Sequence, residues 1–291
     1  MAEALQLIAN GVVIGSVVAV SAVGLTLVFG VLRLINFAHG DFLTLGAFVA
    51  VLGTGAGLPL YVAAVPAIAS GALVAGGLEK TLWGPMRRRG ASTVNLLIIS
   101  IGLALVLRYT LFWIFGEGVY RFGPVSRRID FGFFALTPQD IAIVVGSAAA
   151  LVGVGLMLQK TRVGKAMRAL SDNRDLAEAS GIDVGRITMV TWLIAGALTA
   201  YGGVLLGLQG RVFANMGWFL LLLIFAGVIL GGIGSAYGAM IGSLVIGVVQ
   251  ELATHSFIGI PADLKTAVAF AALILVLLVR PQGILGRKQA L

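Results

Sequence analysis

Runs of apolar residues about 20 long, the length that a helix needs to cross a hydrocarbon core of about 30 Å, follow one another along nearly the whole chain. They do not alternate between apolar and polar positions, as the strands of a membrane barrel would. Since backbone groups in lipid must be hydrogen-bonded within the protein, we expect an all-α, polytopic integral membrane helical bundle. Eight or nine transmembrane helices are predicted, some short or discontinuous. The runs cover Leu5–Val31, Gly40–Gly55, Tyr61–Leu78, Asn95–Phe115, Ile141–Leu158, Ile187–Leu208, Trp218–Gly231, Tyr237–Gln250 and Leu264–Val279.

Composition agrees with a membrane protein. Hydrophobic residues make up 59% of the chain and charged residues 11%, with a mean hydropathy of +1.05. Soluble domains carry about 25% charged residues. The runs are distributed evenly enough to form one transmembrane domain over residues 1–291. The chain has no cysteine, which excludes disulfides and thiolate chemistry.

Basic residues are concentrated in three links between the runs. Cytoplasmic loops of membrane proteins carry an excess of Lys and Arg, so these three regions, including the C-terminus, are predicted to be cytoplasmic. The N-terminus and the loop at Gly116–Thr137 then face outward. The net charge of +8 therefore reports topology rather than nucleic-acid binding. The residues are Lys80, Arg87, Arg88 and Arg89; Lys160, Arg162, Lys165, Arg168, Arg174 and Arg186; and Arg280, Arg287 and Lys288.

Polar side chains interrupt the apolar pattern in LRLINFAHGDFLTLGAF, residues 32–48. A charged side chain at depth is costly, so it normally faces protein or a wet cavity. One interpretation is structural: Asn36, His39 and Asp41 cap the N-terminus of the second helix, where a carboxylate is favoured. The other is functional: these side chains line a substrate path. The sequence leaves both open.

Two segments share a glycine-punctuated break followed by a short apolar helix, Gly30–Ala50 and Gly231–Gly247. Paired short, glycine-interrupted segments in the two halves of a transporter indicate an internal repeat with the transport path at its interface. We therefore expect such a repeat here. The predicted helix-break glycines are Gly40, Gly232, Gly234 and Gly238.

The candidates for a translocation path are the polar or aromatic residues within the runs. Structural alternatives exist for two of them, because Arg108 can reach an interface or pair with a carboxylate, and Glu251 can be solvated at an external loop. The candidates are Asn36, His39, Asp41, Thr44, Arg108, Tyr109 and Glu251.

The motifs NFAHGD with LTLGAF, LGGIGS with YGAMIG, and LILVLLVRPQGILGR resemble the permeases of ATP-binding-cassette importers for branched-chain amino acids, the Liv-type family, and within it the H-type permease. The similarity runs from about Gly11 to Arg287. It implies import of Leu, Ile and Val or, in sister systems, of urea and short amides. It also implies a second homologous permease, two cytoplasmic ATP-binding subunits and an extracytoplasmic solute-binding protein, in a bacterial or archaeal cytoplasmic membrane.

Motifs of catalysis are absent from the sequence. No GxxxxGK[ST] phosphate loop occurs, since Gly164 and Lys165 are followed by Ala166, and neither GxSxG nor HExxH is found. We therefore expect a transport permease that is not an enzyme and holds no cofactor or metal. By the resemblance, ATP and Mg²⁺ belong to the partner ATPases.

A cytoplasmic segment at residues 159–186 combines apolar positions at helical spacing with charges of both signs. Gly181 suits a sharp turn after a short helix. The family resemblance implies that this segment contacts the ATPase, whereas the alternative is a solvated loop that only sets topology. The residues implied in coupling are Arg168, Arg174, Asp175, Ala177, Glu178, Ala179, Gly181 and Ile182.

Rival functions remain open at this point. An ion-coupled secondary carrier or a channel would bury acidic ion sites, and Asp41 is the one plausible buried acid. A purely structural membrane subunit would not need a polar helix break. One departure from the family pattern, Leu223 where a lysine would be expected, leaves the solute open.

Overall fold

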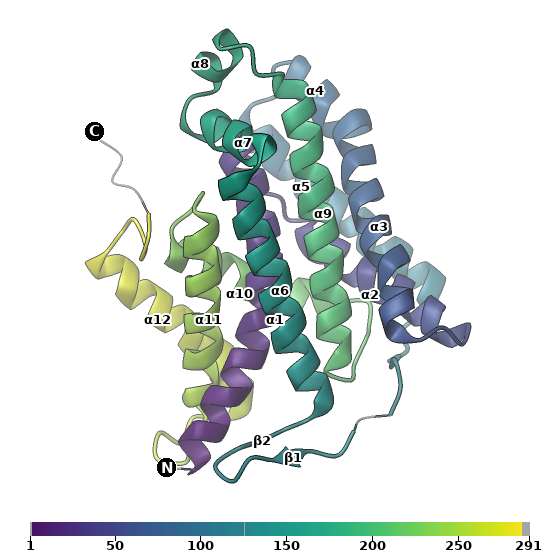
Figure 1. The fold of residues 1–291 in the computed structure, drawn as a ribbon, viewed down its shortest axis with the longest axis vertical. Coiled ribbons are helices and arrows are strands. Elements are labelled where there is room, and N and C mark those ends of the chain that lie inside the picture. The colour runs from purple at the N-terminus through teal and green to yellow at the C-terminus, as the bar shows by residue number, and fades with distance from the viewer. Residues whose placement is uncertain (1, 125, 287–291) are drawn as a thin grey trace.

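The computed structural model describes residues 2–124 and 126–286 as a bundle of helices (Figure 1). Each of the nine predicted apolar runs forms a helix, which confirms the prediction of a polytopic helical membrane protein. The helices of these runs are α1 (Ala2–Leu32), α2 (His39–Gly55), α3 (Leu60–Leu78), α5 (Thr93–Phe115), α6 (Pro138–Lys160), α9 (Val184–Leu208), α10 (Met216–Gly231), α11 (Ala236–Leu252) and α12 (Lys265–Val279).

Smaller elements lie in the links. A π-helical turn (Glu79–Trp83) and α4 (Gly84–Arg88) prolong α3, and a 3₁₀ turn (Ala262–Leu264) precedes α12. The basic segment after α6 forms α7 (Arg162–Asp172) and α8 (Arg174–Ala179). Between α5 and α6, β1 (Ile129–Asp130) pairs antiparallel with β2 (Ala135–Leu136), with Ile129 opposite Leu136.

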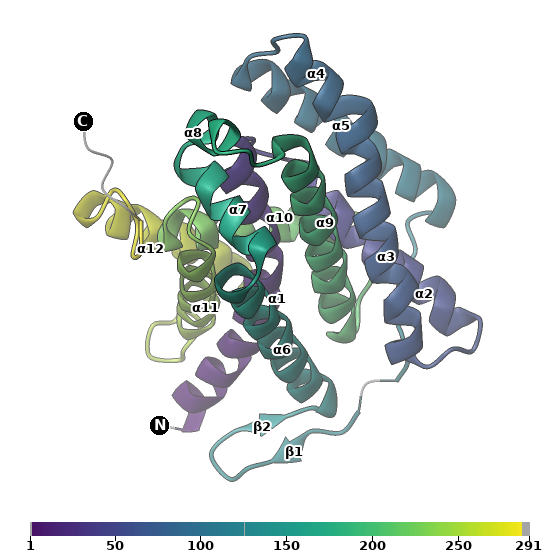
Figure 2. The same cartoon turned by 45° about the horizontal axis from the view of Figure 1, so that its top comes forward.

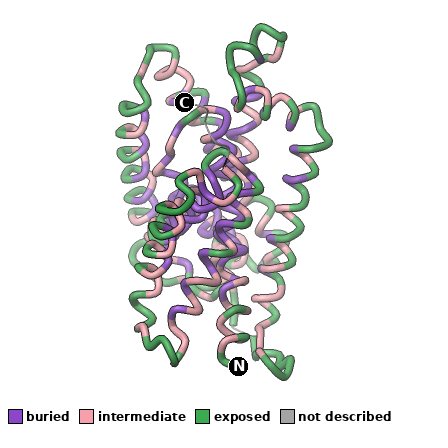
Figure 3. Tube along the Cα trace, turned by 90° about the vertical axis from the view of Figure 1, so that its left-hand side faces the viewer, coloured by how far each residue is buried: buried purple, intermediate pink, exposed green. Residues whose placement is uncertain are grey.

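Six of the helical stretches are long and apolar enough to cross a membrane, and α2, α10 and α11 are shorter. Burial separates a central helix from peripheral ones. The most apolar window of α1 is 83% buried, whereas those of α5 and α12 are 22% and 11% buried. Figure 3 shows the buried residues gathered along the middle of the bundle. The outer helices therefore expose apolar side chains, as lipid-facing helices do.

Two of the three basic regions lie at one end of the bundle. Figure 1 places α4, α7 and α8 at this end, which we call the α8 end, and the N-terminus at the other, whereas the described residues that follow α12 lie nearer mid-height. Figure 2 brings the α8 end forward and shows α7 and α8 beside the ends of α1 and α9. Arg287 and Lys288 lie outside the described residues. The clustering is the charge asymmetry that the positive-inside rule describes.

The two halves of the chain repeat one pattern in opposite directions. In the first half α1 runs toward the α8 end and α2 turns back, while in the second half α9 runs away from it and α10 turns back (Figure 1). The main packing partners agree, because α1 packs on α11 and α9 packs on α3. We predicted a repeat with Gly231–Gly247 as the counterpart of Gly30–Ala50. In the structure α10 is the counterpart of α2, because Gly231–Gly247 begins with a tight turn between α10 and α11.

The starts of α2 and α10 touch. The backbone amide of Gly217 donates to Thr44 Oγ1 at 3.0 Å, and a Cβ atom on Gly217 would fall on the carbonyl oxygen of Gly40. A Cβ on Gly40 would in turn lie 2.5 Å from the carbonyl oxygen of Gly217. Two small residues therefore allow both backbones to meet, as in close helix packing in membranes.

Candidate functional site

The chain leaves helical geometry between α1 and α2. Arg33, the first residue of this break, has φ of +53° and is the only non-glycine residue with positive φ in the described part of the chain. Ser100 of α5 stabilises the break, because its Oγ accepts from the Phe37 amide at 3.2 Å and lies 3.3 Å from the Ile35 carbonyl oxygen. Irregular backbone at membrane depth needs such internal partners.

Asn36 and His39 hold the break in place. Asn36 Oδ1 accepts from the Ala38 amide at 3.1 Å, and its Nδ2 is buried without a hydrogen-bond partner among residues 2–124 and 126–286. His39, 1% exposed, places Nε2 2.9 Å from the Ser21 carbonyl oxygen and 3.0 Å from Thr199 Oγ1. Its imidazole therefore lies buried between α1 and α9.

The capping interpretation fits only Asn36, whose Oδ1 accepts from the amide of Ala38, the N-cap residue of α2. No side chain of the polar cluster accepts a hydrogen bond from an amide of the first turn of α2. Backbone carbonyls take that place, since the amides of Asp41 and Phe42 donate to the Ala38 carbonyl at 3.0 and 3.2 Å. The carboxylate of Asp41 is thereby left for another partner.

That partner is Arg108 of α5. Its Nε and Nη2 donate to the two carboxylate oxygens of Asp41 at 3.1 and 3.3 Å, and both residues are buried. The guanidinium carbon also lies 4.2 Å from the ring centroid of Trp218 of α10, a cation–π contact. An arginine at membrane depth is costly when isolated, and here a carboxylate and an aromatic face compensate it.

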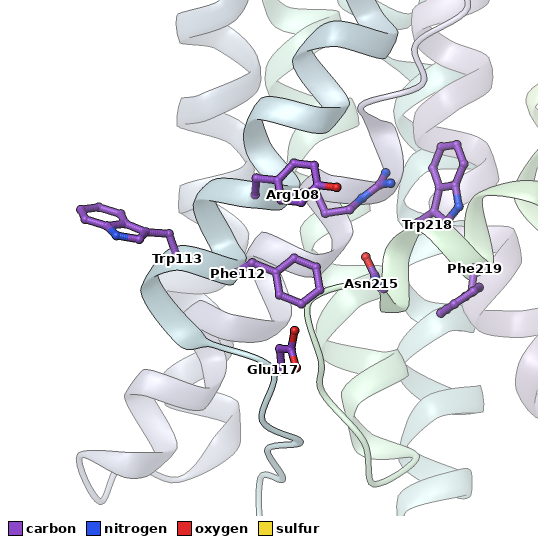
Figure 4. A pocket seen from close by; sticks show the side chains of 8 residues that line it. Arg108, Phe112, Trp113, Glu117, Asn215, Trp218 and Phe219 are labelled. Carbon is purple, nitrogen blue, oxygen red and sulfur yellow. The ribbon is translucent and has the colours of Figure 1, made fainter.

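A hollow of about 650 Å³ opens beside this ion pair, between the ends of α5 and α10 (Figure 4). Figure 4 shows the Arg108 guanidinium directed toward Trp218, and the side chains of Asn215 and Glu117 directed toward the space in front of Phe112. Trp113 points away from this centre. The hollow thus combines a cation, a carboxylate and an amide with aromatic walls. Its lining residues are Arg108, Tyr109, Phe112, Trp113, Glu117, Asn215, Trp218 and Phe219.

The structure brings only part of the predicted path together. Arg108 and Tyr109 line the hollow, and Asp41 lies directly behind Arg108. Thr44 instead joins α2 to α10 through Gly217. Glu251 accepts a hydrogen bond from Lys265 Nζ at 2.6 Å, between α11 and α12.

The helix-break glycines have separate positions. Gly40 lies in the first turn of α2, at the contact with α10. Gly232 and Gly234, with φ of +106° and +87°, form the turn between α10 and α11, and Gly238 in the first turn of α11 packs against Gly231. Only Gly40 therefore belongs to a break at mid-depth.

Within residues 159–186, the predicted coupling segment, α8 is capped at both ends. Asn173 Oδ1 accepts from the Leu176 amide at 3.0 Å at the start of α8. At its end Gly181 has φ of +83°, its amide donates to the Glu178 carbonyl at 2.9 Å, and the Ile182 amide donates to the Ala177 carbonyl at 3.1 Å. These bonds form a Schellman motif, which requires glycine at this position.

Most side chains of the predicted coupling segment are exposed. Ala177 is buried at 4% exposure and Ile182 is partly buried, whereas Leu176 is 64% exposed. Arg33 ties the segment to the break, because its Nη2 donates to the Ser171 carbonyl at 3.2 Å. The exposed residues among those predicted for coupling are Arg168, Arg174, Asp175, Glu178, Ala179 and Gly181.

Two arginines flank one backbone bridge at the end opposite α8. Tyr120 and Val212 exchange backbone hydrogen bonds of 2.8 and 2.9 Å in an antiparallel bridge. Arg121 follows Tyr120 and Arg211 precedes Val212, so both arginines lie directly beside this bridge, one on each of the two paired segments. Both are exposed, and neither has an ion-pair partner in the described chain.

Sequence reasoning missed several residues of the site. Trp218 and Asn215 were not singled out, because nothing in the sequence around them indicates that they lie close to Arg108. Glu117 belongs to a loop that looked like an ordinary connection. Ser100 was a single small polar residue in a long apolar run, and nothing in the sequence indicated that it contacts the break between α1 and α2.

Comparison with known proteins decides the family. Residues 7–277 match the family described as branched-chain amino acid transport system / permease component. The chain belongs to this family. The match covers the break, the ion pair, the hollow and the predicted coupling segment, and it confirms the resemblance carried by the three sequence motifs.

Members of this permease family from bacteria and archaea are similar over nearly full length. The chain is 31% identical over 302 residues to the high-affinity branched-chain amino acid transport system permease protein BraD of Pseudomonas aeruginosa, covering 98% of this chain and 96% of that protein. It is 31% identical over 301 residues to LivH of Escherichia coli K12, with the same coverage. A probable branched-chain amino acid transport permease of Methanocaldococcus jannaschii is 28% identical over 293 residues, 97% of this chain and 92% of that protein. No solved structure matches the chain significantly.

Proposed function

We propose that the chain is one of two permeases in an ATP-driven importer of branched-chain amino acids. The observation that carries this proposal is the hollow beside Asp41 and Arg108, which places paired charges and aromatic walls within an otherwise apolar bundle. The near-full-length relatives named for branched-chain amino acid transport support the solute. They give no support to urea or short amides as alternative solutes.

The chain is proposed to work with four kinds of partner. Because its sequence has no phosphate loop, two cytoplasmic ATP-binding subunits would bind ATP and Mg²⁺. A second homologous permease would cover the hollow, since polar groups at membrane depth need protein or water against them. An extracytoplasmic solute-binding protein would deliver the amino acid, and lipid would surround the outer helices.

The α8 end is proposed to face the cytoplasm. The basic residues gathered at this end support that orientation by the positive-inside rule, and the C-terminus would then be cytoplasmic as well. The location would be the cytoplasmic membrane of a bacterium or archaeon. Within the single transmembrane domain 1–291, residues 159–186 would form the ATPase-coupling segment, with the exposed face of α8 in contact with the ATPase.

The rival function is an ion-coupled carrier that needs no ATPase. Its strongest candidate ion site, Asp41, is already paired with Arg108, which leaves little negative charge for a cation. The ion pair therefore favours the importer.

Purification and reconstitution test the proposal. The chain is expected to copurify with two nucleotide-binding subunits and a second permease, and the assembled complex should take up leucine only with ATP and a loaded solute-binding protein. Uptake by the chain alone in liposomes, driven by an ion gradient, would establish the carrier instead.

A further inference from the structure

The hollow presents two opposite charges to the same space. Arg108 has five N–H donors, of which Asp41 uses two, so Nη1 and the second N–H of Nη2 are free to bind a ligand. Glu117 is exposed, lines the same hollow and has no hydrogen-bond or ion-pair partner among the described residues. In Figure 4 its carboxylate is directed toward the hollow from the side opposite Arg108.

Asn215 adds an uncommitted amide between these charges. It is the N-cap residue of α10, but its side chain makes no capping hydrogen bond. Figure 4 instead shows its side chain directed into the hollow. An asparagine at this position normally caps the helix, so without a capping bond its carbonyl oxygen and both N–H groups are left for a ligand.

The hollow has the size of a small-molecule site. Its two charges come from one helix and the loop that follows it, because Arg108 belongs to α5 and Glu117 lies two residues beyond Phe115, the last residue of α5. The volume of about 650 Å³ lies within the range typical of small-molecule sites.

From these observations we propose that the hollow is a subsite that binds the main chain of an amino acid. Arg108 binds the α-carboxylate, Glu117 binds the α-ammonium group, and the rings of Phe112 and Phe219 contact the aliphatic side chain. This assignment rests on the proposed function and specifies the site through which it operates. It explains why charged groups are kept on a face that the second permease would cover: a zwitterion needs both charges paired when it leaves water.

The ion pair with Asp41 adjusts the strength of this site. A lone guanidinium at membrane depth would bind a carboxylate tightly and release it slowly, because the local dielectric is low. Asp41 neutralises most of that charge from behind, so the ligand is bound weakly and leaves again. A weak site suits a permease, since conduction requires binding that permits exit.

Binding to the assembled importer, without its solute-binding protein, tests the assignment. The probes are leucine, leucinamide, which lacks the carboxylate, and 4-methylpentanoate, which lacks the ammonium group. Trp218 in the hollow supplies a fluorescence signal, and Trp218→Phe identifies the part that comes from this site. Each analogue should bind at least about tenfold more weakly than leucine, since each loses one charge-assisted hydrogen bond.

The variant Glu117→Gln tests the role of the Glu117 charge independently of that of Arg108. Glu117 is exposed in a loop, so the variant is expected to fold and assemble. It should lose the preference for leucine over 4-methylpentanoate and keep the preference over leucinamide. Equal binding of all three probes to the wild type, or both preferences unchanged in Glu117→Gln, would overturn the assignment. ATP-driven leucine uptake is measured in parallel, so that failure of the subsite can be told from failure of the proposed function. Uptake without discrimination between the probes refutes the subsite alone. Absence of uptake of any branched-chain amino acid refutes the proposed function.

Discussion

Arg108 of α5 donates hydrogen bonds to both carboxylate oxygens of Asp41 in the first turn of α2. This ion pair fastens a mostly lipid-facing helix to the helix that begins at mid-depth. Its two members are 67 residues apart in the chain, and both are buried. The pair is therefore a structural support of the hollow as well as part of its chemistry.

Breaking this pair on one side is expected to destabilise the permease. Arg108→Gln leaves the Asp41 carboxylate buried without its cation, which costs about 3–5 kcal/mol in comparable pairs. Thermal unfolding of the purified complex in detergent should show a lower midpoint. The double variant Asp41→Asn/Arg108→Gln removes both charges and should recover most of the loss. Equal midpoints for wild type and Arg108→Gln would show that the pair contributes no stability.

A methyl group at the contact of α2 with α10 is expected to separate the two helices. In Gly217→Ala the new Cβ collides with the Gly40 carbonyl, and overpacking of this kind costs about 1–3 kcal/mol. Gly102→Ala in α5 is the matched control, because nothing lies within 4 Å of its Cβ and alanine favours a helix by about 1 kcal/mol over glycine. The yield of folded protein and its thermal midpoint should fall only for Gly217→Ala.

The exposed face of α8 is expected to hold the ATPase. Leu176→Asp places a charge on an apolar side chain that is 64% exposed, and it should reduce copurification of the ATP-binding subunits without affecting membrane insertion. Ile129→Asp, at a 45% exposed isoleucine in β1, is the control and should leave copurification unchanged. If both variants retain the ATPases in wild-type amount, contact at this face is refuted.

A bulky residue on the same segment is expected to uncouple ATP hydrolysis from uptake. Gly181→Leu forces a side chain into a left-handed backbone conformation and disturbs the cap of α8, and Glu178→Leu changes its exposed surface alone. Both variants should still insert and assemble, while uptake per ATP hydrolysed falls. Unchanged uptake and unchanged substrate-stimulated hydrolysis in both would exclude coupling through α8.

The neighbouring arginines Arg121 and Arg211 are expected to attract an acidic surface of the solute-binding protein. Like charges that flank one backbone bridge are unfavourable unless a partner compensates them. The double variant Arg121→Glu/Arg211→Glu should raise the KM for the loaded solute-binding protein in ATPase stimulation. Added salt should raise the KM of the wild type but not that of the variant, because exposed charges are screened. An unchanged KM would remove this face from the docking surface.

The hydrophobic pattern was sufficient to predict the fold class. Each apolar run became a helix within a few residues of its predicted ends, because segments in lipid have few alternatives to helix. The repeat was harder to assign. Glycines mark both the mid-depth contact at Gly40 and the tight turn at Gly232 and Gly234, so the same residue type suggested the wrong counterpart for α2.

Only the site residues that are charged or strongly polar could be predicted, because such residues are rare within the apolar runs. Asp41 and Arg108 stood out because buried charges are costly, but their pairing depends on how α5 packs against α2, which no local pattern specifies. His39 stood out for the same reason, and the structure places it between α1 and α9 as a structural residue. Trp218 and Asn215 escaped notice because aromatic and amide groups are unremarkable near the start of an apolar helix.

The meeting of Gly40 with Gly217 limits how the bundle can move. The short helices α2 and α10 start at this contact and run in opposite directions. Because their backbones touch there, we expect the start of one helix to move only together with the start of the other. Because α1 also packs on α11 and α9 on α3, we expect alternating access to turn interlocked helices of both halves about this shared contact. Opening toward one side of the membrane and closing toward the other are then a single motion.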